Sequence, residues 1–202
     1  MSQKRRLLIE EWLPAAAIGV ECMRERSTGQ NPPNARLHVW FARRPLCASR
    51  AAVLGSLLPA DFPRDVFERL LGFGHPGEEL VRLRKLMDTV GASQRIGFGC
   101  DRAFKKRIAP TDVETLHNAI YDFWDELPTV VDPMAGGGSI PLESARLGLP
   151  TVANELNPVA CTILEATIQY PIAHGLGLGA ASRHWADELR ARFVARLQRF
   201  FS

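Results

Sequence analysis

The sequence predicts an α/β protein in which one β-α-β unit follows a mostly helical N-terminal extension. The unit is indicated by two short apolar runs that each end near an acid, with three consecutive glycines between them. The extension is indicated by apolar residues that recur every three or four positions, which is helical spacing. We expect the extension to span residues 1–125 and the β-α-β-α part of the second domain to span residues 126–202.

The composition is that of a soluble globular protein, with 46% apolar and 23% charged residues in a chain of 202. The net charge of +3 does not by itself indicate a nucleic-acid partner. The four cysteines form no CxxC pair, so neither a zinc ribbon nor another metal site is expected. No apolar run is long enough to span a membrane or to act as a signal peptide, so we predict a cytoplasmic protein with no membrane partner.

Helices are expected along most of the N-terminal extension. The first should occupy residues 7–25 and break or restart at Pro14, because proline lacks a backbone N–H. Three more are expected at about residues 47–58, 63–71 and 78–90. The next should begin with a capping box formed by Thr111 and Glu114.

Asn31, Pro32 and Pro33 are a weak candidate for a catalytic clamp. Asn-Pro-Pro followed by an aromatic residue holds the target amine in amino-group methyltransferases. The aromatic position is occupied here by Asn34, so an ordinary proline-rich loop is the favoured interpretation. No other residue is predicted to be catalytic.

An aromatic and basic cluster precedes the second helix. Its members are His38, Trp40, Phe41, Arg43 and Arg44, and Pro45 closes it. From spacing alone, Trp40 and Phe41 are expected to fill the core while the arginines are solvated. The alternative is a lip over a nucleotide, with a ring for stacking and arginines for anionic groups.

The β-α-β unit begins at a strand formed by Val130 and Val131, with Asp132 at its carboxyl end. Ligands of open α/β sheets bind at that edge. The glycines that follow allow backbone N–H groups to approach a ligand closely. Ser139 is expected to cap the next helix and Gly148 to end it.

The second strand is expected at residues 151–153 and is followed by Glu155. At this position a carboxylate can accept hydrogen bonds from two ribose hydroxyls. Asn157 and Pro158 should then start a helix that packs on the sheet through Val159 and further apolar residues.

The chain ends in a predicted amphipathic helix from about residue 179 to residue 202. Its apolar stripe consists of Trp185, Leu189, Phe193, Leu197 and Phe200. We expect this stripe to face the core, and a stripe that docks a partner protein is the alternative.

Two cofactors compete for the glycine loop. A dinucleotide fingerprint requires a third glycine where this chain has Pro141, which disfavours NAD. The segment from Asp132 to Gly138 instead fits Asp-Pro-x-x-Gly-x-Gly, the pattern of enzymes that use S-adenosylmethionine. The residues predicted to bind this cofactor are Asp132, Pro133, Met134, Ala135, Gly136, Gly138, Glu155, Leu156 and Asn157.

Two blocks of the sequence resemble the N-terminal part of the large adenine-specific DNA methylases that carry a zinc ribbon further along. One block runs from Leu37 to Leu46 and is similar to that family's LHxWWARRPL, with Phe41 in place of the second tryptophan. The other combines Asp132–Glu143 with Asn157–Ala160. The resemblance implies a Rossmann-like methyltransferase sheet, incomplete in this chain, and implies that Arg44 and Pro45 belong to a segment that closes over the methionine end of the cofactor.

The resemblance further implies transfer of a methyl group to an exocyclic amine of DNA, N6 of adenine above all. Members of the family carry Asp-Pro-Pro-Tyr after the second strand, and this chain does not. We therefore expect the catalytic motif to come from further sequence or from a partner chain. The resemblance also implies a place in a restriction or phage-defence system. A non-catalytic scaffold subunit is the alternative, and an NAD-binding enzyme is a weaker one.

Overall fold

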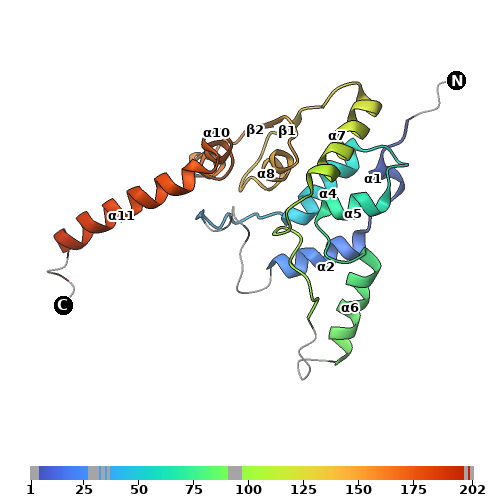
Figure 1. The fold of residues 1–202 in the computed structure, drawn as a ribbon, viewed down its shortest axis with the longest axis horizontal. Coiled ribbons are helices and arrows are strands. Elements are labelled where there is room, and N and C mark those ends of the chain that lie inside the picture. The colour runs from blue at the N-terminus through green and yellow to red at the C-terminus, as the bar shows by residue number, and fades with distance from the viewer. Residues whose placement is uncertain are drawn as a thin grey trace.

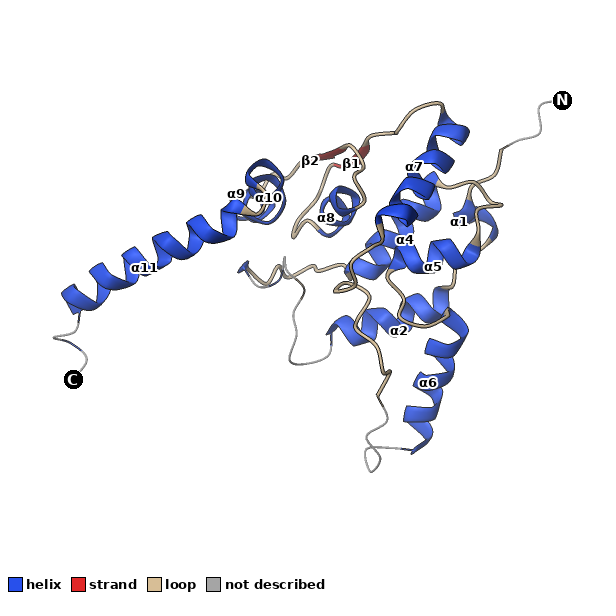
Figure 2. Ribbon diagram, in the orientation of Figure 1, coloured by secondary structure: helices blue, strands red, loops and turns tan. Residues whose placement is uncertain are grey.

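The computed structural model describes residues 5–26, 32, 35, 37–90, 97–197 and 200. Helices make up most of this part of the chain, and a two-stranded parallel sheet lies beside them (Figures 1 and 2). The prediction of a mixed α/β protein is therefore confirmed at this level. No helix among the described residues is both long and apolar enough to cross a membrane.

The N-terminal part is a body of packed helices. In order they are α1 (Leu8–Glu11), α2 (Ala15–Arg26), α4 (Leu46–Leu57), α5 (Arg64–Leu71), α6 (Gly77–Val90) and α7 (Pro110–Trp124). Pro14 separates α1 from α2, as predicted. The core of this body includes Leu8, Leu54, Phe67, Leu70 and Leu80, all fully buried.

The start of α7 differs from the prediction. Pro110 is the first residue of the helix and Ala109 is the N-cap, with no side chain capping the end. Proline suits this position because its fixed φ is already helical and its missing N–H would have no helical partner. Thr111 therefore lies inside the helix, and the predicted capping box is wrong.

The sheet pairs β1 (Val130–Asp132) with β2 (Thr151–Ala153) in parallel. The register places Val130 opposite Thr151 and Asp132 opposite Ala153, so the carboxyl ends of both strands meet at one edge. Helix α8 (Ser139–Arg146) connects the strands and packs against α4 of the helical body. Both strands and the connecting helix were predicted within one or two residues.

The cap of α8 is not the predicted one. Gly138, at φ +77°, is the N-cap, and Ser139 is the first helical residue. The Ser139 hydroxyl donates to the backbone oxygen of Arg44 at 2.8 Å instead of capping the helix. Gly148, at φ +70°, follows the end of α8, as expected of a residue that must adopt a left-handed conformation.

One hydrophobic core includes residues of both predicted segments. Leu147 and Leu149, which follow the end of α8, belong to the same buried cluster as Leu116 and Ile120 of α7. The domain boundary near residue 125 stays a prediction.

After β2 the chain forms α9 (Pro158–Leu164), a π-helical segment (Glu165–Gln169), α10 (Tyr170–His174) and α11 (Gly177–Leu197). Helix α9 buries Ala160 and Ile163. Val159 is 49% exposed, so the predicted packing of Val159 on the sheet is wrong. Helix α11 extends away from the body (Figure 1).

The apolar stripe on α11 does not face the core. Trp185, Leu189 and Phe193 are each more than half exposed. None of the α11 residues whose burial the structure describes is buried, and the main packing of the helix is with α10. The predicted core face is therefore wrong.

Candidate functional site at the glycine loop

The loop between β1 and α8 is tied to the end of β2 by backbone hydrogen bonds. Asn154 N donates to Asp132 O at 2.9 Å, and Ala135 N donates to Asn154 O at 3.1 Å. The loop then turns through Gly136 and Gly138, whose φ values of +53° and +77° favour glycine. These bonds bring together the two acids that the sequence analysis singled out.

Asp132 has a carboxylate with one satisfied and one unsatisfied oxygen. The residue is 7% exposed, and its Oδ1 accepts a hydrogen bond from Met134 N at 3.2 Å. Its Oδ2 is buried and has no hydrogen-bond partner among the described residues. A buried carboxylate oxygen without a donor is costly, and such a group calls for an explanation such as a ligand that brings a donor.

Glu155 holds the glycine loop from the other side. Its Oε2 accepts from Gly136 N at 2.7 Å, and its Oε1 accepts from Leu156 N at 2.8 Å and from Asn157 N at 3.2 Å. These hydrogen bonds, that from Gly136 foremost, lower the pKa of the Glu155 carboxyl below its usual value.

The hydrogen bonds that Glu155 accepts from the backbone compete with its predicted role as an acceptor for ribose. A carboxylate has about four acceptor positions, and three backbone donors already use most of them. A ribose would share Oε2 with Gly136 N or displace it. The binding of ribose by Glu155 stays a prediction.

The other predicted cofactor residues lie around the same loop with different exposure. Met134 and Leu156 are 77% and 96% exposed, whereas Ala135 is buried. Asn157 is the N-cap of α9, where its Oδ1 accepts from Val159 N at 2.9 Å. The Asn157 side chain therefore has a structural role in this conformation.

Trp40 lies directly against the glycine loop. A Cβ atom on Gly136 would be 2.7 Å from Trp40 Nε1, and a Cβ atom on Gly137 would be 3.0 Å from Trp40 Cβ. Phe41 stacks on Trp40 at a tilted angle and is 88% exposed, so the expectation that Phe41 fills the core is wrong. The bond from Ser139 to Arg44 fastens the same segment to the start of α8.

The sequence alone separates Trp40 from Gly136 by almost a hundred positions. The structure brings them into contact, which is the arrangement that a segment closing over the loop requires. Pro45, the N-cap of α4, ends this segment.

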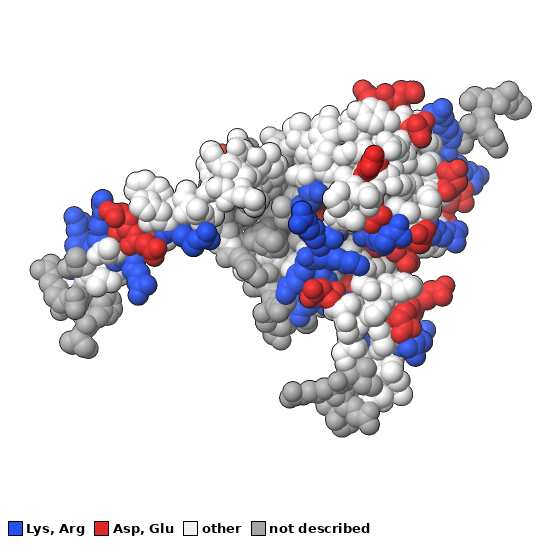
Figure 3. Space-filling view, viewed as in Figure 1, with Lys and Arg blue, Asp and Glu red and all other residues white. Residues whose placement is uncertain are grey.

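Three arginines lie near one another beside this segment. Arg26, Arg43 and Arg44 line a small cavity together with the buried Glu25 and with Pro45. Figure 3 shows Lys and Arg side chains gathered on the face of the helical body that borders the sheet-bearing part. Of the predicted clamp, Pro32 is buried, and Asn31 and Pro33 lie outside the described residues.

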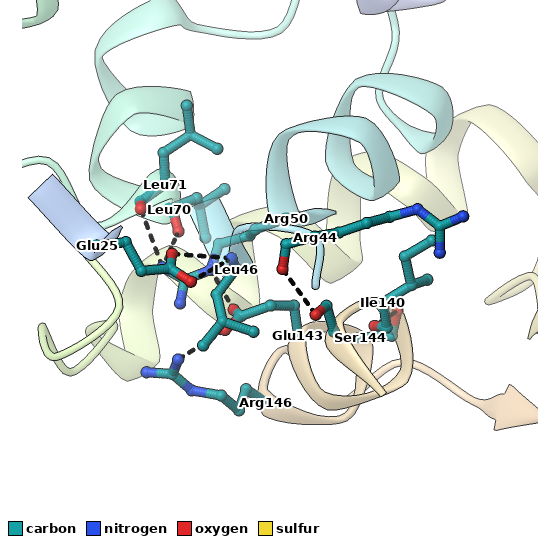
Figure 4. A network of polar contacts seen from close by, with 11 residues as sticks. Glu25, Arg44, Leu46, Arg50, Leu70, Leu71, Ile140, Glu143, Ser144 and Arg146 are labelled. Atoms are coloured by element: carbon teal, nitrogen blue, oxygen red, sulfur yellow. Dashed lines mark hydrogen bonds and ion pairs between the residues drawn. The ribbon is translucent and has the colours of Figure 1, made fainter. Parts of the chain in front are cut away.

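Arg50 and Glu143 form a buried ion pair that the sequence analysis missed (Figure 4). Both side chains are fully buried, and Arg50 Nε donates to Glu143 Oε2 at 2.5 Å. Arg50 Nη1 also donates to the backbone oxygens of Leu70 and Leu71 at the end of α5. The sequence did contain a signal for a buried charge. Glu143 lies four positions before Leu147, so a helix that buries Leu147 also turns Glu143 inward.

Glu25 is a second buried acid next to this pair. Both of its carboxylate oxygens accept from Leu46 N, at 3.1 and 2.9 Å, at the start of α4. Burial is the main cause that raises the pKa of Glu25, and the nearby Glu143 adds to the rise. Glu25 thus supplies the acceptor for an N-terminus that Pro45 cannot cap with a side chain.

An open cavity of about 860 Å³ lies beside β2. It is lined mainly by apolar side chains from α8, α9 and the π-helical segment, among them Pro141, Leu164 and Ile168. Leu164 and Ile168 also contact Gly138, where a Cβ atom would lie 2.8 Å from Leu164 Cδ2. Among the residues that the structure covers, no group of three or more His, Cys, Asp or Glu side chains could hold a metal ion.

Comparison with known proteins gives one match. Residues 12–71 match the model of a family described as "Protein of unknown function (DUF1156)". The matched segment contains α2, α4 and α5 as well as Trp40 and Arg44, and it ends before the glycine loop. No curated protein and no solved structure matches the chain. Over residues 12–71 the chain is therefore similar to an uncharacterised family.

Proposed function

We propose that this chain is the S-adenosylmethionine-binding portion of a DNA amino-methyltransferase, with N6 of adenine as the target. The observation that carries the proposal is Asp132 Oδ2, a buried carboxylate oxygen without a donor beside a glycine loop. The methionine end of S-adenosylmethionine carries an ammonium group, which is a donor of the kind this oxygen lacks. When bound, the cofactor supplies a methyl group on a positively charged sulfur.

The residues around the loop fit this cofactor better than a dinucleotide. Gly136 and Gly138 have no side chain, and the space that a Cβ atom would take is occupied by Trp40 at Gly136 and by Leu164 at Gly138, so a ligand would approach the loop beside these side chains. In a dinucleotide site the third glycine allows close packing of helix and strand, and here Pro141 occupies that place. Asp132, Gly136 and Gly138 would hold the methionine end, and Glu155 would accept from the ribose in exchange for a backbone donor.

Catalysis on DNA would need groups from outside this chain. We propose that further sequence or a partner subunit brings a motif of the Asp-Pro-Pro-Tyr type, as the resemblance to the DNA methylases implies. Both strands of the sheet have one unpaired edge, and Val131 and Val152 on one face are 60% and 53% exposed. Parallel sheets are normally covered on both faces, which supports an assembly in which other elements complete this one.

Calorimetry on the purified chain tests the cofactor proposal. Wild-type protein should bind S-adenosylmethionine, and Asp132→Asn should weaken binding by at least about tenfold, since a hydrogen bond between charged groups contributes about 1.5–3 kcal/mol. The matched control is Asp187→Asn on the exposed helix α11, which should bind like wild type.

Two outcomes would contradict the proposal. One is a wild-type chain that binds no S-adenosylmethionine while circular dichroism shows that it is folded. The other is binding that Asp132→Asn leaves unchanged. A titration with NAD in parallel would reveal the dinucleotide alternative.

A non-catalytic scaffold is the second candidate, and the exposed apolar residues of α11 favour it. Trp185, Leu189 and Phe193 together present an apolar surface of the kind that docks a protein. A scaffold would assemble with its partners equally well with Asp132→Asn, whereas DNA methylation by an assembled methyltransferase would be lost.

The proposed methyltransferase would act in the cytoplasm, as part of a restriction or phage-defence system.

A further inference from the structure

We infer that the indole N–H of Trp40 donates a hydrogen bond to the carboxylate of the bound amino-acid moiety. Trp40 and Asp132 would then together hold an α-amino-acid zwitterion over the glycine loop. The inference rests on the proposed function. It adds a specific donor and a specific chemical group of the ligand, neither of which the glycine motif identifies.

The indole meets the loop through its N–H edge. The three Trp40 atoms nearest to a Cβ on Gly136 would be Nε1 at 2.7 Å, Cδ1 at 3.2 Å and Cε2 at 3.5 Å. These are the pyrrole nitrogen and its two bonded neighbours, so the nitrogen lies at the contact. Trp40 is half-buried, and none of the described residues accepts a hydrogen bond from its Nε1, so this N–H is available to a ligand.

The backbone amides of the loop are largely committed to other acceptors. Gly136 N donates to Glu155 Oε2 and Gly138 N donates to Ala135 O at 2.8 Å. A carboxylate lying on the loop would therefore find those two amides in use. Trp40 Nε1, at the surface of Gly136, is a donor placed beside them.

The segment that carries Trp40 is fixed at both sides of the indole. The base of the side chain rests on Gly137, where a Cβ atom would be 3.0 Å from Trp40 Cβ. The ring packs against Phe41, with 4.9 Å between centroids, and Ser139 holds the Arg44 backbone. A donor held by its surroundings loses little entropy when it binds a ligand.

The donor and the acceptor thus match the two charges of a zwitterion. Asp132 Oδ2 is a buried acceptor without a donor, and Trp40 Nε1 is a half-buried donor that no described residue engages. Both lie at one glycine loop. An α-amino acid presents an ammonium and a carboxylate on the same carbon, so one ligand group satisfies both.

Decarboxylated S-adenosylmethionine isolates the carboxylate in a binding experiment. Wild-type chain should bind S-adenosylmethionine about tenfold more tightly than the decarboxylated compound, the size expected for one hydrogen bond to a charged acceptor. Trp40→Phe keeps an aromatic ring on the loop but removes the donor. This variant should bind S-adenosylmethionine about tenfold more weakly and the decarboxylated compound as wild type does.

Trp185→Phe on α11 is the matched control and should behave like wild type with both ligands. If Trp40→Phe weakens both ligands equally, Trp40 only packs against the loop and the inference is overturned. If it weakens neither, Trp40 has no part in binding and the inference is likewise overturned. A folded wild-type chain that binds neither ligand would instead contradict the proposed function itself.

Discussion

At Gly136 the backbone has a φ of +53°, and a Cβ atom would lie 2.7 Å from Trp40 Nε1. Two separate costs therefore attach to any side chain there. The left-handed conformation costs about 1–2 kcal/mol for an L-residue. The steric overlap would in addition push the Trp40 segment away from the loop.

Gly136→Ala compared with Gly99→Ala separates these costs. Gly99 has a similar φ, +66°, and nothing lies within 4 Å of its Cβ position. Gly99→Ala should lose about 1–2 kcal/mol of unfolding free energy in urea, and Gly136→Ala should lose more because its Cβ atom would also overlap Trp40. Only Gly136→Ala should shift the fluorescence of Trp40, measured as the difference from the same variant carrying Trp40→Phe. Equal fluorescence in the two variants would show that Trp40 does not rest on Gly136 in solution.

At this scale the sequence predicted which residues surround the site but not how they pair. The spacing from Asp132 to Gly138 identified the loop, because glycines and a strand-ending acid are local signals. Glu155 was predicted to accept hydrogen bonds from a ribose, and the structure shows that it also accepts one from the backbone of the glycine loop. That contact depends on the path of the chain after β2 ends at Ala153, which no local pattern encodes.

Among the elements, α4 and α8 form the connection that positions the site. Their buried link is the ion pair between Arg50 and Glu143, with Arg146 donating to the other oxygen of Glu143 at 2.8 Å. Because α8 begins where the glycine loop ends, this link also fixes the direction in which the loop leaves β1. Breaking a buried pair leaves one charge without compensation, which is why such a break is more costly than the pair is stabilising.

Glu143→Leu should therefore destabilise the protein by about 3–5 kcal/mol, as measured by urea unfolding. The same change at Glu188, which pairs with Arg192 on the exposed helix α11, should cost less than about 1 kcal/mol. The double variant Arg50→Met/Glu143→Leu should recover part of the loss, since neither member of the pair is then left as a buried charge without its partner. A loss at Glu143 no larger than that at Glu188 would contradict the structural role assigned to the pair.

Most elements were predicted from apolar spacing and from proline and glycine positions, and most of their boundaries hold. The errors fall where tertiary contacts decide. The Ser139 hydroxyl resembled a cap in sequence, but the Arg44 backbone lies close enough to accept from it. The pairing of Arg50 with Glu143 spans 93 positions and so leaves no local pattern.

The molecule as a whole combines a well-buried body with a poorly covered end. The body shares one core from Leu8 to Leu149. Within the described part of the chain, the sheet beyond it has two strands only, and α11 extends from α10 with no residue of known burial in the core. Amphipathic spacing predicted a core contact for α11 because periodicity tells which residues share a face and not whether anything covers that face.

Removing α11 tests this view of the molecule. A chain ending at Gly175 should unfold at the same urea midpoint as the full chain, with a change in unfolding free energy below about 0.5 kcal/mol, because exposed residues contribute little to stability. Its helical ellipticity should fall in proportion to the residues removed. S-adenosylmethionine binding should be unchanged, since no residue proposed for the site lies beyond Asn157.

A chain ending at Asn157 is the contrasting control. It also lacks α9, whose Ala160 and Ile163 are buried, and it removes Leu164 and Ile168 from their contact with Gly138. The loss of a buried isoleucine alone corresponds to about 2–5 kcal/mol, so this chain should unfold at a much lower urea concentration. If the chain ending at Gly175 were destabilised to a similar degree, α11 would have to pack on the body in solution. If only the shorter chain is destabilised, the apolar residues of α11 do not stabilise this part of the protein, which supports the proposal that a partner protein or further sequence covers them.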